Sequence, residues 1–204
     1  MAAMLTRNRQ SSDSRQAEIV ATMVRLSAAR SPSEITTVDI AHEMNVTQGA
    51  LFRHFPSKEA IRLAVVEWIA TTLLAELQSA RAAAPDALQA LRKMFMAHVR
   101  FAMTYPGAPR LIFGELQQPE DSPVRQGVLA IMRRYRQMLA ETFAVAVAAK
   151  LIRDDLDLQA AAGLFLGAVQ GLVIQSMLQH SPAGMEVQAA GVLELYLAGL
   201  ERAS

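Results

Sequence analysis

Apolar residues recur at three- and four-residue spacing along almost the whole chain, which is the period of a helix rather than a strand. Prolines, glycines and residues that cap helix ends divide this pattern into segments. The expected helices occupy residues 14–28, 37–44, 48–55, 57–83, 86–105, 110–116, 123–149, 158–179 and 187–201. The sequence therefore predicts an all-α protein of about nine helices.

Residues 36–61 contain the capping and helix-terminating residues expected for two short helices around a tight turn, followed by the start of a third helix. Their sequence is TTVDIAHEMNVTQGALFRHFPSKEAI. The hydroxyls of Thr36 and Thr47 can cap the first two helices. Asn45 interrupts the first helix, and Pro56 ends the second because the residue before a proline avoids helical angles. This arrangement predicts a helix-turn-helix, whose second helix enters the major groove of DNA.

Polar side chains on the second of these helices carry groups that can recognise DNA. Gln48 is the best candidate for a direct base contact, because a carboxamide both donates to and accepts from an adenine edge. Arg53 can reach a guanine or a phosphate, whereas His54 and Lys58 suit phosphates, which fix position but carry no sequence information. The alternative for Gln48 is an ordinary exposed polar residue on a short helix.

Residues 15–65 resemble the DNA-binding head of the TetR family of bacterial transcriptional regulators. TTVDIA and NVTQGALFRHFPSKEA carry the resemblance, since the caps, the core positions and Lys58 fall in register together. Two departures stand out: Phe52 replaces a common tyrosine, whose hydroxyl would contact phosphate, and residues 28–32 lack the glycine often found after the first helix. With the residues that the family places at the DNA surface, the predicted contact set is Thr36, Thr37, Thr47, Gln48, Gly49, Ala50, Phe52, Arg53, His54 and Lys58.

The resemblance implies a DNA-binding head at residues 1–62 and a body at residues 63–204 that binds a ligand and forms a homodimer. The protein is then a repressor of a palindromic operator in double-stranded DNA. A small hydrophobic or amphipathic ligand, enclosed by the fifth to eighth helices, releases it. The candidate pocket residues are Met94, His98, Phe101, Phe113, Glu115, Tyr135, Met138, Gln170 and Met177. Considered alone, the methionines also suit core filling, His98 a core position and Glu115 a solvated surface.

Three glycines lie four residues apart in the eighth expected helix, at Gly163, Gly167 and Gly171. Each costs up to about 1 kcal/mol relative to alanine in a helix interior, so close approach of another helix is expected to offset that cost. The stripe can pack within the subunit, or it can form a two-fold dimer interface. The second interpretation is preferred, because such regulators pair across two half-sites. Its candidate residues are Gly163, Gly167, Gly171, Ile174 and Leu178.

Composition narrows the remaining possibilities. The 204 residues contain no cysteine, which excludes disulfides and thiolate metal sites. The net charge is only +1, and residues 1–62 carry eight Arg and Lys against six Asp and Glu, so DNA affinity must come from local placement of charge. Arg7 and Arg9 suit either a disordered polar tail or an arm that contacts phosphate or the minor groove.

Several other classes are disfavoured by what the sequence lacks. The longest apolar run, residues 163–174, falls short of the roughly 18 residues of a membrane span, and no secretory h-region is present. The expected protein is therefore cytoplasmic, with no membrane partner. The four histidines are scattered, which predicts no metal, no cofactor and no enzyme. Two alternative hypotheses to a ligand-released repressor remain, namely a ligand-independent DNA-binding regulator and an activator. An enzyme that carries a helix-turn-helix is less favoured than either.

Overall fold

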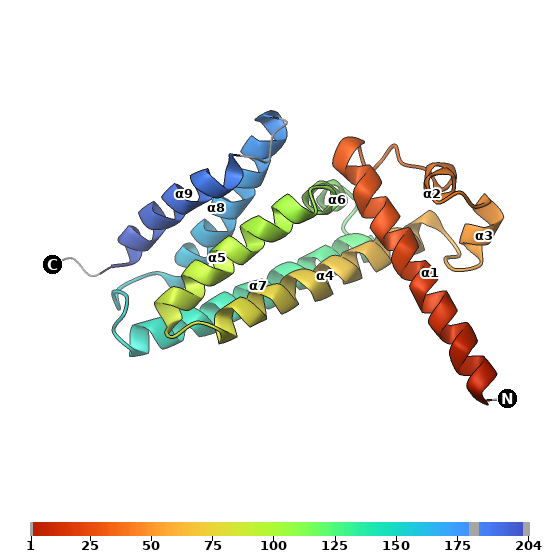
Figure 1. The fold of residues 1–204 in the computed structure, drawn as a ribbon. Helices are drawn as coiled ribbons and strands as arrows, with labels where there is room; N and C mark the ends of the chain where they lie inside the picture. The colour runs from red at the N-terminus through yellow and green to blue at the C-terminus, as the bar shows by residue number, and fades with distance from the viewer. Residues whose placement is uncertain (1, 180–183, 202–204) are drawn as a thin grey trace. The chain divides into compact units, whose positions relative to one another are not determined.

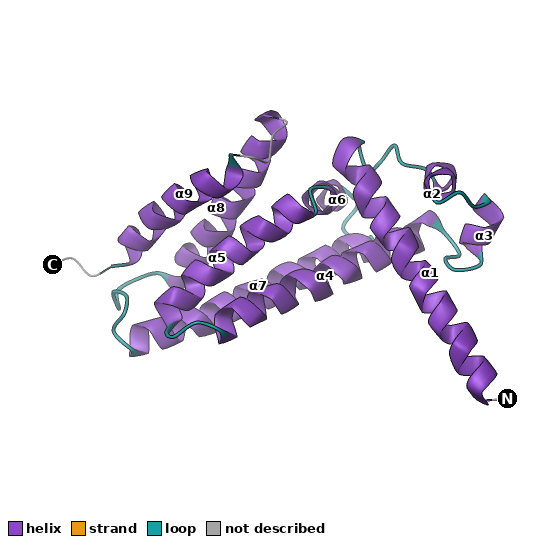
Figure 2. Cartoon of the chain, in the orientation of Figure 1, coloured by secondary structure: helices purple, strands orange, loops and turns teal. Residues whose placement is uncertain are grey.

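The computed structural model describes residues 2–179 and 184–201, with side chains from residue 12 onward, and in this part of the chain every regular element is a helix (Figures 1 and 2). The prediction of an all-α fold with about nine helices is confirmed. The helices are α1 (Ala2–Ala29), α2 (Thr37–Glu43), α3 (Gln48–Phe52), α4 (Lys58–Ala82), α5 (Ala87–Thr104), α6 (Gly107–Leu116), α7 (Pro123–Ala148), α8 (Leu158–Gln179) and α9 (Met185–Leu200).

Three predicted boundaries are wrong by more than two residues. α1 begins at Ala2 rather than at residue 14, because residues 2–13 contain neither glycine nor proline to stop a helix, although their polar character hides the period. α3 ends at Phe52, three residues early. α6 begins at Gly107 rather than at residue 110, since a proline is tolerated in the first turn of a helix. The side chains of Arg7 and Arg9 lie outside the described residues.

The chain forms two compact units, residues 1–70 with 105–129 and residues 71–104 with 130–204. The predicted functional boundary at residue 62 stays a prediction, and the compact units divide elsewhere, within α4, between α5 and α6, and within α7. In the first unit α1 packs against α6. A Cβ atom added at Gly107 would collide with the carbonyl oxygen of Val24 and lie 2.9 Å from the backbone nitrogen of Ala28. Only glycine therefore permits this approach of the two helix backbones.

A partly buried ion pair also crosses the first unit. Arg62 of α4 donates from Nε to Oε1 of Glu115 at 2.7 Å, and from Nη2 to the other carboxylate oxygen. The Glu115 side chain is only 5% exposed, so the expectation of a solvated acid is wrong. The carboxylate hydrogen bond raises the pKa of Arg62. The pair joins the first turns of α4 to the end of α6.

The core of the second unit is aromatic. α5, α8 and α9 pack together there, as Figure 1 shows. The ring of Phe165 on α8 lies 5.3 Å from that of Phe95 and 5.7 Å from that of Tyr196, both in edge-to-face geometry. The Tyr196 hydroxyl donates to the carbonyl of Ala161 at 2.9 Å, which satisfies its polar group inside the core.

α8 corrects one expectation from the sequence. By length and composition this 22-residue helix is apolar enough to cross a membrane, since the mean hydropathy of its most apolar stretch is 1.6, although glycines and Gln170 interrupt its longest apolar run. Only 39% of its most apolar stretch is buried inside the chain. Core helices of soluble proteins can be equally long and apolar, so these properties alone do not indicate a membrane span. A substantial apolar surface on α8 is therefore left for something else to cover.

Candidate nucleic-acid interface

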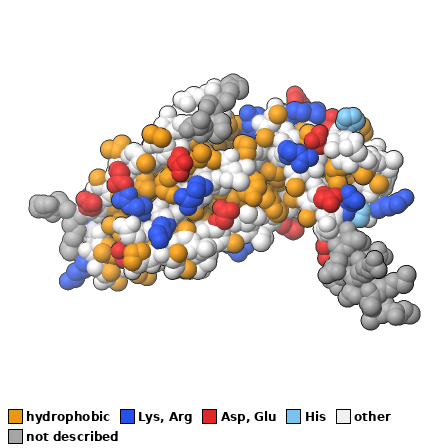
Figure 3. Space-filling model, viewed as in Figure 1, with side chains coloured by type: hydrophobic (Ala, Val, Ile, Leu, Met, Phe, Trp, Pro, Cys, Tyr) orange, Lys and Arg blue, Asp and Glu red, His pale blue; other side chains and the backbone are white. Residues whose placement is uncertain are grey.

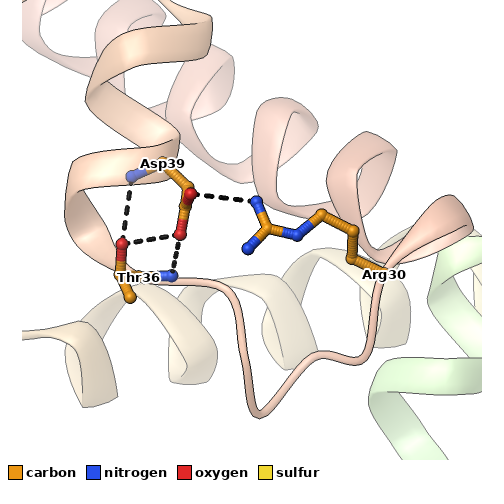
Figure 4. Close-up of polar contacts among 3 residues, drawn as sticks. All are labelled: Arg30, Thr36 and Asp39. Atoms are coloured by element: carbon orange, nitrogen blue, oxygen red, sulfur yellow. Dashed lines mark hydrogen bonds and ion pairs between the residues drawn. The ribbon is translucent and has the colours of Figure 1, made fainter.

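The start of α2 is fixed by a reciprocal set of hydrogen bonds, drawn in Figure 4. The backbone nitrogen of Asp39 donates to Oγ1 of Thr36 at 3.1 Å, and the backbone nitrogen of Thr36 donates to Oδ2 of Asp39 at 2.7 Å. This is a capping box, which satisfies two otherwise unpaired donors. Arg30 donates to Oδ1 of Asp39 at 2.9 Å, and that bond with the Thr36 contacts holds the pKa of Asp39 far below its usual range.

The turn between α2 and α3 has a defined geometry. Asn45 adopts a φ of 54°, in the left-handed region that asparagine tolerates better than most residues. The nitrogen of Val46 donates to the carbonyl of Ala41, and that of Asn45 donates to the carbonyl of His42. These two bonds form a Schellman motif that ends α2 and sets the direction of the next helix.

α3 presents Gln48 from a capped N-terminus. Oγ1 of Thr47 accepts from the backbone nitrogen of Ala50 at 3.2 Å, as the sequence predicted. The side-chain Nε2 of Gln48 donates to Oγ1 of Thr37 on α2 at 2.7 Å. A carboxamide has two N–H donors and one carbonyl, so this bond leaves one donor and the acceptor free. Those are the two groups that an adenine edge requires.

The other predicted contact residues differ in how free they are. Gln48, Gly49, Phe52 and Arg53 are exposed, and a Cβ added at Gly49 would meet nothing closer than 4.0 Å. Thr36 and Thr47 are also exposed, while Thr37 and Ala50 are half-buried. The backbone at Gly49 is therefore open to an approaching surface.

His54 and Lys58 are engaged inside the protein. The His54 carbonyl accepts from Gln16 at 3.0 Å, and its ring Nδ1 lies 3.4 Å from the hydroxyl of Ser12, both on α1. Nζ of Lys58 donates to the carbonyl of Ser33 at 3.2 Å, and burial lowers its pKa. These two residues support the helix-turn-helix, a role that sequence reasoning missed because their partners lie 25 or more residues away.

Charge around this surface is mixed. On the face drawn in Figure 3, Lys and Arg side chains are interspersed with Asp and Glu side chains, in keeping with the low net charge of the chain. Among the residues that the structure describes, no cluster of His, Cys, Asp and Glu has the geometry to hold a metal ion.

The ligand-pocket candidates are divided between the two compact units. Phe113 and Glu115 belong to the first unit, and Glu115 is occupied by Arg62. The second unit holds the others, which are Met94, His98, Phe101, Tyr135, Met138, Gln170 and Met177. Met94, Phe101 and Tyr135 are buried in the core, so they fill space rather than line an open surface.

His98 is a half-buried polar group that borders that core. Its Nδ1 lies 3.3 Å from the hydroxyl of Tyr135, and desolvation lowers the pKa of His98 to about 4. The imidazole is therefore neutral near pH 7. Elsewhere in the second unit a groove of about 480 Å³ runs between α4 and α7, lined among others by Leu74, Met138 and the ion pair of Arg81 with Glu141.

The glycine stripe of α8 has no neighbour among the described residues. A Cβ atom added at Gly163, Gly167 or Gly171 would meet nothing within 4 Å. Ile174 and Leu178 continue the stripe and are exposed, Leu178 by 68%. On α9 Val187 and Leu195 are exposed in the same way. Packing against the part of the chain that the structure describes therefore does not explain the stripe.

A capped helix-turn-helix that exposes a carboxamide on its second helix, followed by a helical body, defines a DNA-binding transcriptional regulator. Two family models match the chain and together cover more than half of it. The first describes the tetR family of bacterial regulatory proteins and matches residues 19–65, and the second describes the tetracycline repressor-like C-terminal domain and matches residues 116–192. The chain belongs to the TetR family.

Individual proteins also match the chain, at low sequence identity. The nucleoid occlusion factor SlmA of Vibrio vulnificus is 28% identical over 116 residues, which are 57% of this chain and 59% of that protein. The chain thus spans about three fifths of the length of this relative. The fatty acid degradation regulator FadR of Bacillus halodurans matches with a TM-score of 0.80 and 17% identity, over 92% of this chain and 97% of that one.

FadR of Bacillus subtilis, solved in complex with stearoyl-CoA, matches with a TM-score of 0.77 and 17% identity, over 91% of this chain and 99% of that one. At such identities the two FadR structures share the fold, and nothing more specific follows from them.

Proposed function

We propose that this regulator is a homodimeric repressor that binds a palindromic operator and is released by a small hydrophobic or amphipathic ligand. The observation that carries the DNA part is the hydrogen bond from Gln48 to Thr37. It fixes the carboxamide in the free protein while leaving the donor and acceptor that read adenine. The proposal includes no catalytic activity, and it places the protein in the cytoplasm with the chromosome.

Operator selection from random duplex DNA tests the DNA part. We expect wild-type protein to enrich one palindromic sequence. Gln48→Ala should relax the preference at one base pair of each half-site by about 1–3 kcal/mol. Arg53→Ala, which replaces a neighbouring exposed cation, is the matched variant for a phosphate contact and should weaken binding to all sequences alike. Enrichment of no sequence by wild-type protein contradicts the proposal.

The dimer part rests on the uncovered apolar surface of α8 and α9. A smooth glycine stripe permits close approach of a second helix, and Ile174, Leu178 and Leu195 are large apolar side chains that a partner would bury. A two-fold dimer also supplies the second recognition helix that a palindrome needs.

Sedimentation at micromolar concentration tests the dimer with a matched pair of variants. Leu178→Glu places a charge on the proposed interface and should give monomers. Val145→Glu places the same charge at an apolar residue of α7 that is 55% exposed, and it should leave the dimer intact. Wild-type protein that sediments only as a monomer contradicts the dimer, as does an equal effect of both variants.

The ligand part is supported by two features of the second unit, the half-buried neutral imidazole of His98 and the groove beside Met138. α4 runs from the first compact unit into the second, so its displacement can carry a signal along the chain. The ligand must favour the non-binding state, and a coupling of about 1–3 kcal/mol gives a several-fold to hundredfold switch. A screen for compounds that release the selected operator tests this part, with apolar carboxylates and acyl thioesters as first probes.

A ligand-independent DNA-binding protein is the second candidate. The tight aromatic packing around Phe165 and the full burial of Tyr135 favour it, because they leave little room beside His98. Operator binding that no compound in the screen alters would favour this second candidate.

A further inference from the structure

Two large apolar side chains are exposed on the helix-turn-helix, one on each of its helices. Phe52 is 42% exposed and lies four residues after Gln48, one turn further along the same side of α3. Val38 is 57% exposed and directly follows Thr37, the residue that holds the Gln48 carboxamide. Phe52 therefore lies beside the proposed base-reading group on α3, and Val38 lies next in the chain to the residue that holds that group from α2.

The fold does not require these two residues to be apolar. α2 buries Ile40 and Ala41, and α3 buries Leu51, whereas Val38 and Phe52 contribute little to that core. Single exposed apolar residues are common on protein surfaces, but these two gather beside one functional group. In the first compact unit, the other large apolar residue of comparable exposure among those described is Leu116, at the end of α6.

The chemistry of the major groove supplies one apolar target. Of the four base pairs, only those with thymine present a methyl group there, and apolar side chains recognise it by contact. Neither valine nor phenylalanine can hydrogen-bond to a phosphate oxygen, so phosphate does not explain their exposure. Contact with a methyl group also removes apolar surface of both partners from water.

We propose that Val38 and Phe52 are specificity-determining residues that contact thymine methyl groups on either side of the base pair read by Gln48. The inference rests on the proposed function, since it requires α3 to enter the major groove. It adds that each half-site carries thymines at the positions flanking that base pair. Cytosine is disfavoured at these positions, because it has no methyl group and presents a different hydrogen-bond pattern.

Deoxyuridine provides the test, because it pairs as thymine does and lacks only the methyl group. In the selected operator each thymine is replaced singly, and binding is measured by fluorescence anisotropy at one fixed salt concentration. We expect wild-type protein to bind about fourfold more weakly when a contacted thymine is replaced, the factor that burial of one methyl-sized group corresponds to. The affected positions should flank the base pair whose preference Gln48→Ala relaxes.

The variants assign each methyl group to a side chain. Val38→Ala should abolish the deoxyuridine effect at one position and Phe52→Ala at the other, while both proteins keep their thermal melting profile because the residues are exposed. Leu116→Ala is the matched control and should retain both effects. The inference is overturned if no replacement weakens wild-type binding, or if the effects persist in both variants. Failure of wild-type protein to enrich any sequence is the separate result that removes the proposed function, and the inference with it.

Discussion

Gly107 offers the sharpest test of how the first compact unit is held together. Replacing it with alanine adds one Cβ atom that would overlap the carbonyl oxygen of Val24 and lie 2.9 Å from the nitrogen of Ala28. Both neighbours are backbone atoms of α1, so no side chain can rotate away. The overlap can be relieved only if α1 and α6 move apart.

The size of the effect follows from that constraint. Overpacking in a core costs about 1–3 kcal/mol and sometimes more, and a collision with helix backbone belongs at the upper end. The gain in helix propensity, at most about 1 kcal/mol, is reduced because Gly107 is the first residue of α6. We expect a net loss of about 3 kcal/mol, or a melting temperature lower by about 10 °C for a chain of this size.

Gly114 is the matched control within the same helix. A Cβ atom there would meet only the Cβ of Pro32, at 4.0 Å, so Gly114→Ala should leave stability unchanged or raise it slightly. Both variants are compared with wild-type protein by circular dichroism during heating, at one protein concentration. If Gly107→Ala melts with or above Gly114→Ala, the proposed close approach of α1 and α6 is refuted.

Three further predictions concern single groups. Glu115→Gln should cost about 2 kcal/mol in urea denaturation, below the range for a fully buried pair because Arg62 is partly exposed. Glu141→Gln, at a more exposed pair, should change the free energy of unfolding much less, and equal effects of the two variants would contradict the argument from burial. Thr36→Ala removes the acceptor of the capping box and should cost about 1 kcal/mol by the same measurement, with Thr71→Ala, an exposed position inside α4, as a control that should not. The pKa of His98 is lowered to about 4 in the folded chain, so the unfolded chain binds a proton first as the pH falls below about 6.5. The free energy of unfolding should therefore decrease between about pH 6.5 and 4, by up to about 3 kcal/mol. His98→Gln should lack this decrease, and a variant whose pH profile of stability matches that of wild-type protein would refute the argument.

The elements that the sequence predicted well are those with local signals. The caps at Thr36 and Thr47 depend on residues no more than three positions away, and both form as expected. Ser57 caps α4 through an equally local bond from the backbone nitrogen of Ala60. The turn at Asn45 is equally local. For this reason the helix-turn-helix could be predicted from the sequence alone, although the end of α3 at Phe52 could not.

Contacts between distant residues could not be predicted in the same way. Arg62 and Glu115 are separated by 53 positions, and nothing near either residue indicates the other. The engagement of His54 by α1 and of Lys58 by the Ser33 carbonyl depends on how the helices pack. The glycine spacing in α8 did indicate a smooth helix face, but the sequence pattern of this chain does not identify the surface that covers it.

The hydrogen bond between Gln48 and Thr37 has a consequence for changing what this protein recognises. A substitution at position 48 alone leaves the hydroxyl of Thr37 without its donor, and a substitution at position 37 alone frees the glutamine to adopt other rotamers. Retargeting the regulator to a new operator therefore means choosing residues at both positions together, and libraries that randomise α3 by itself will undersample the sequences that work.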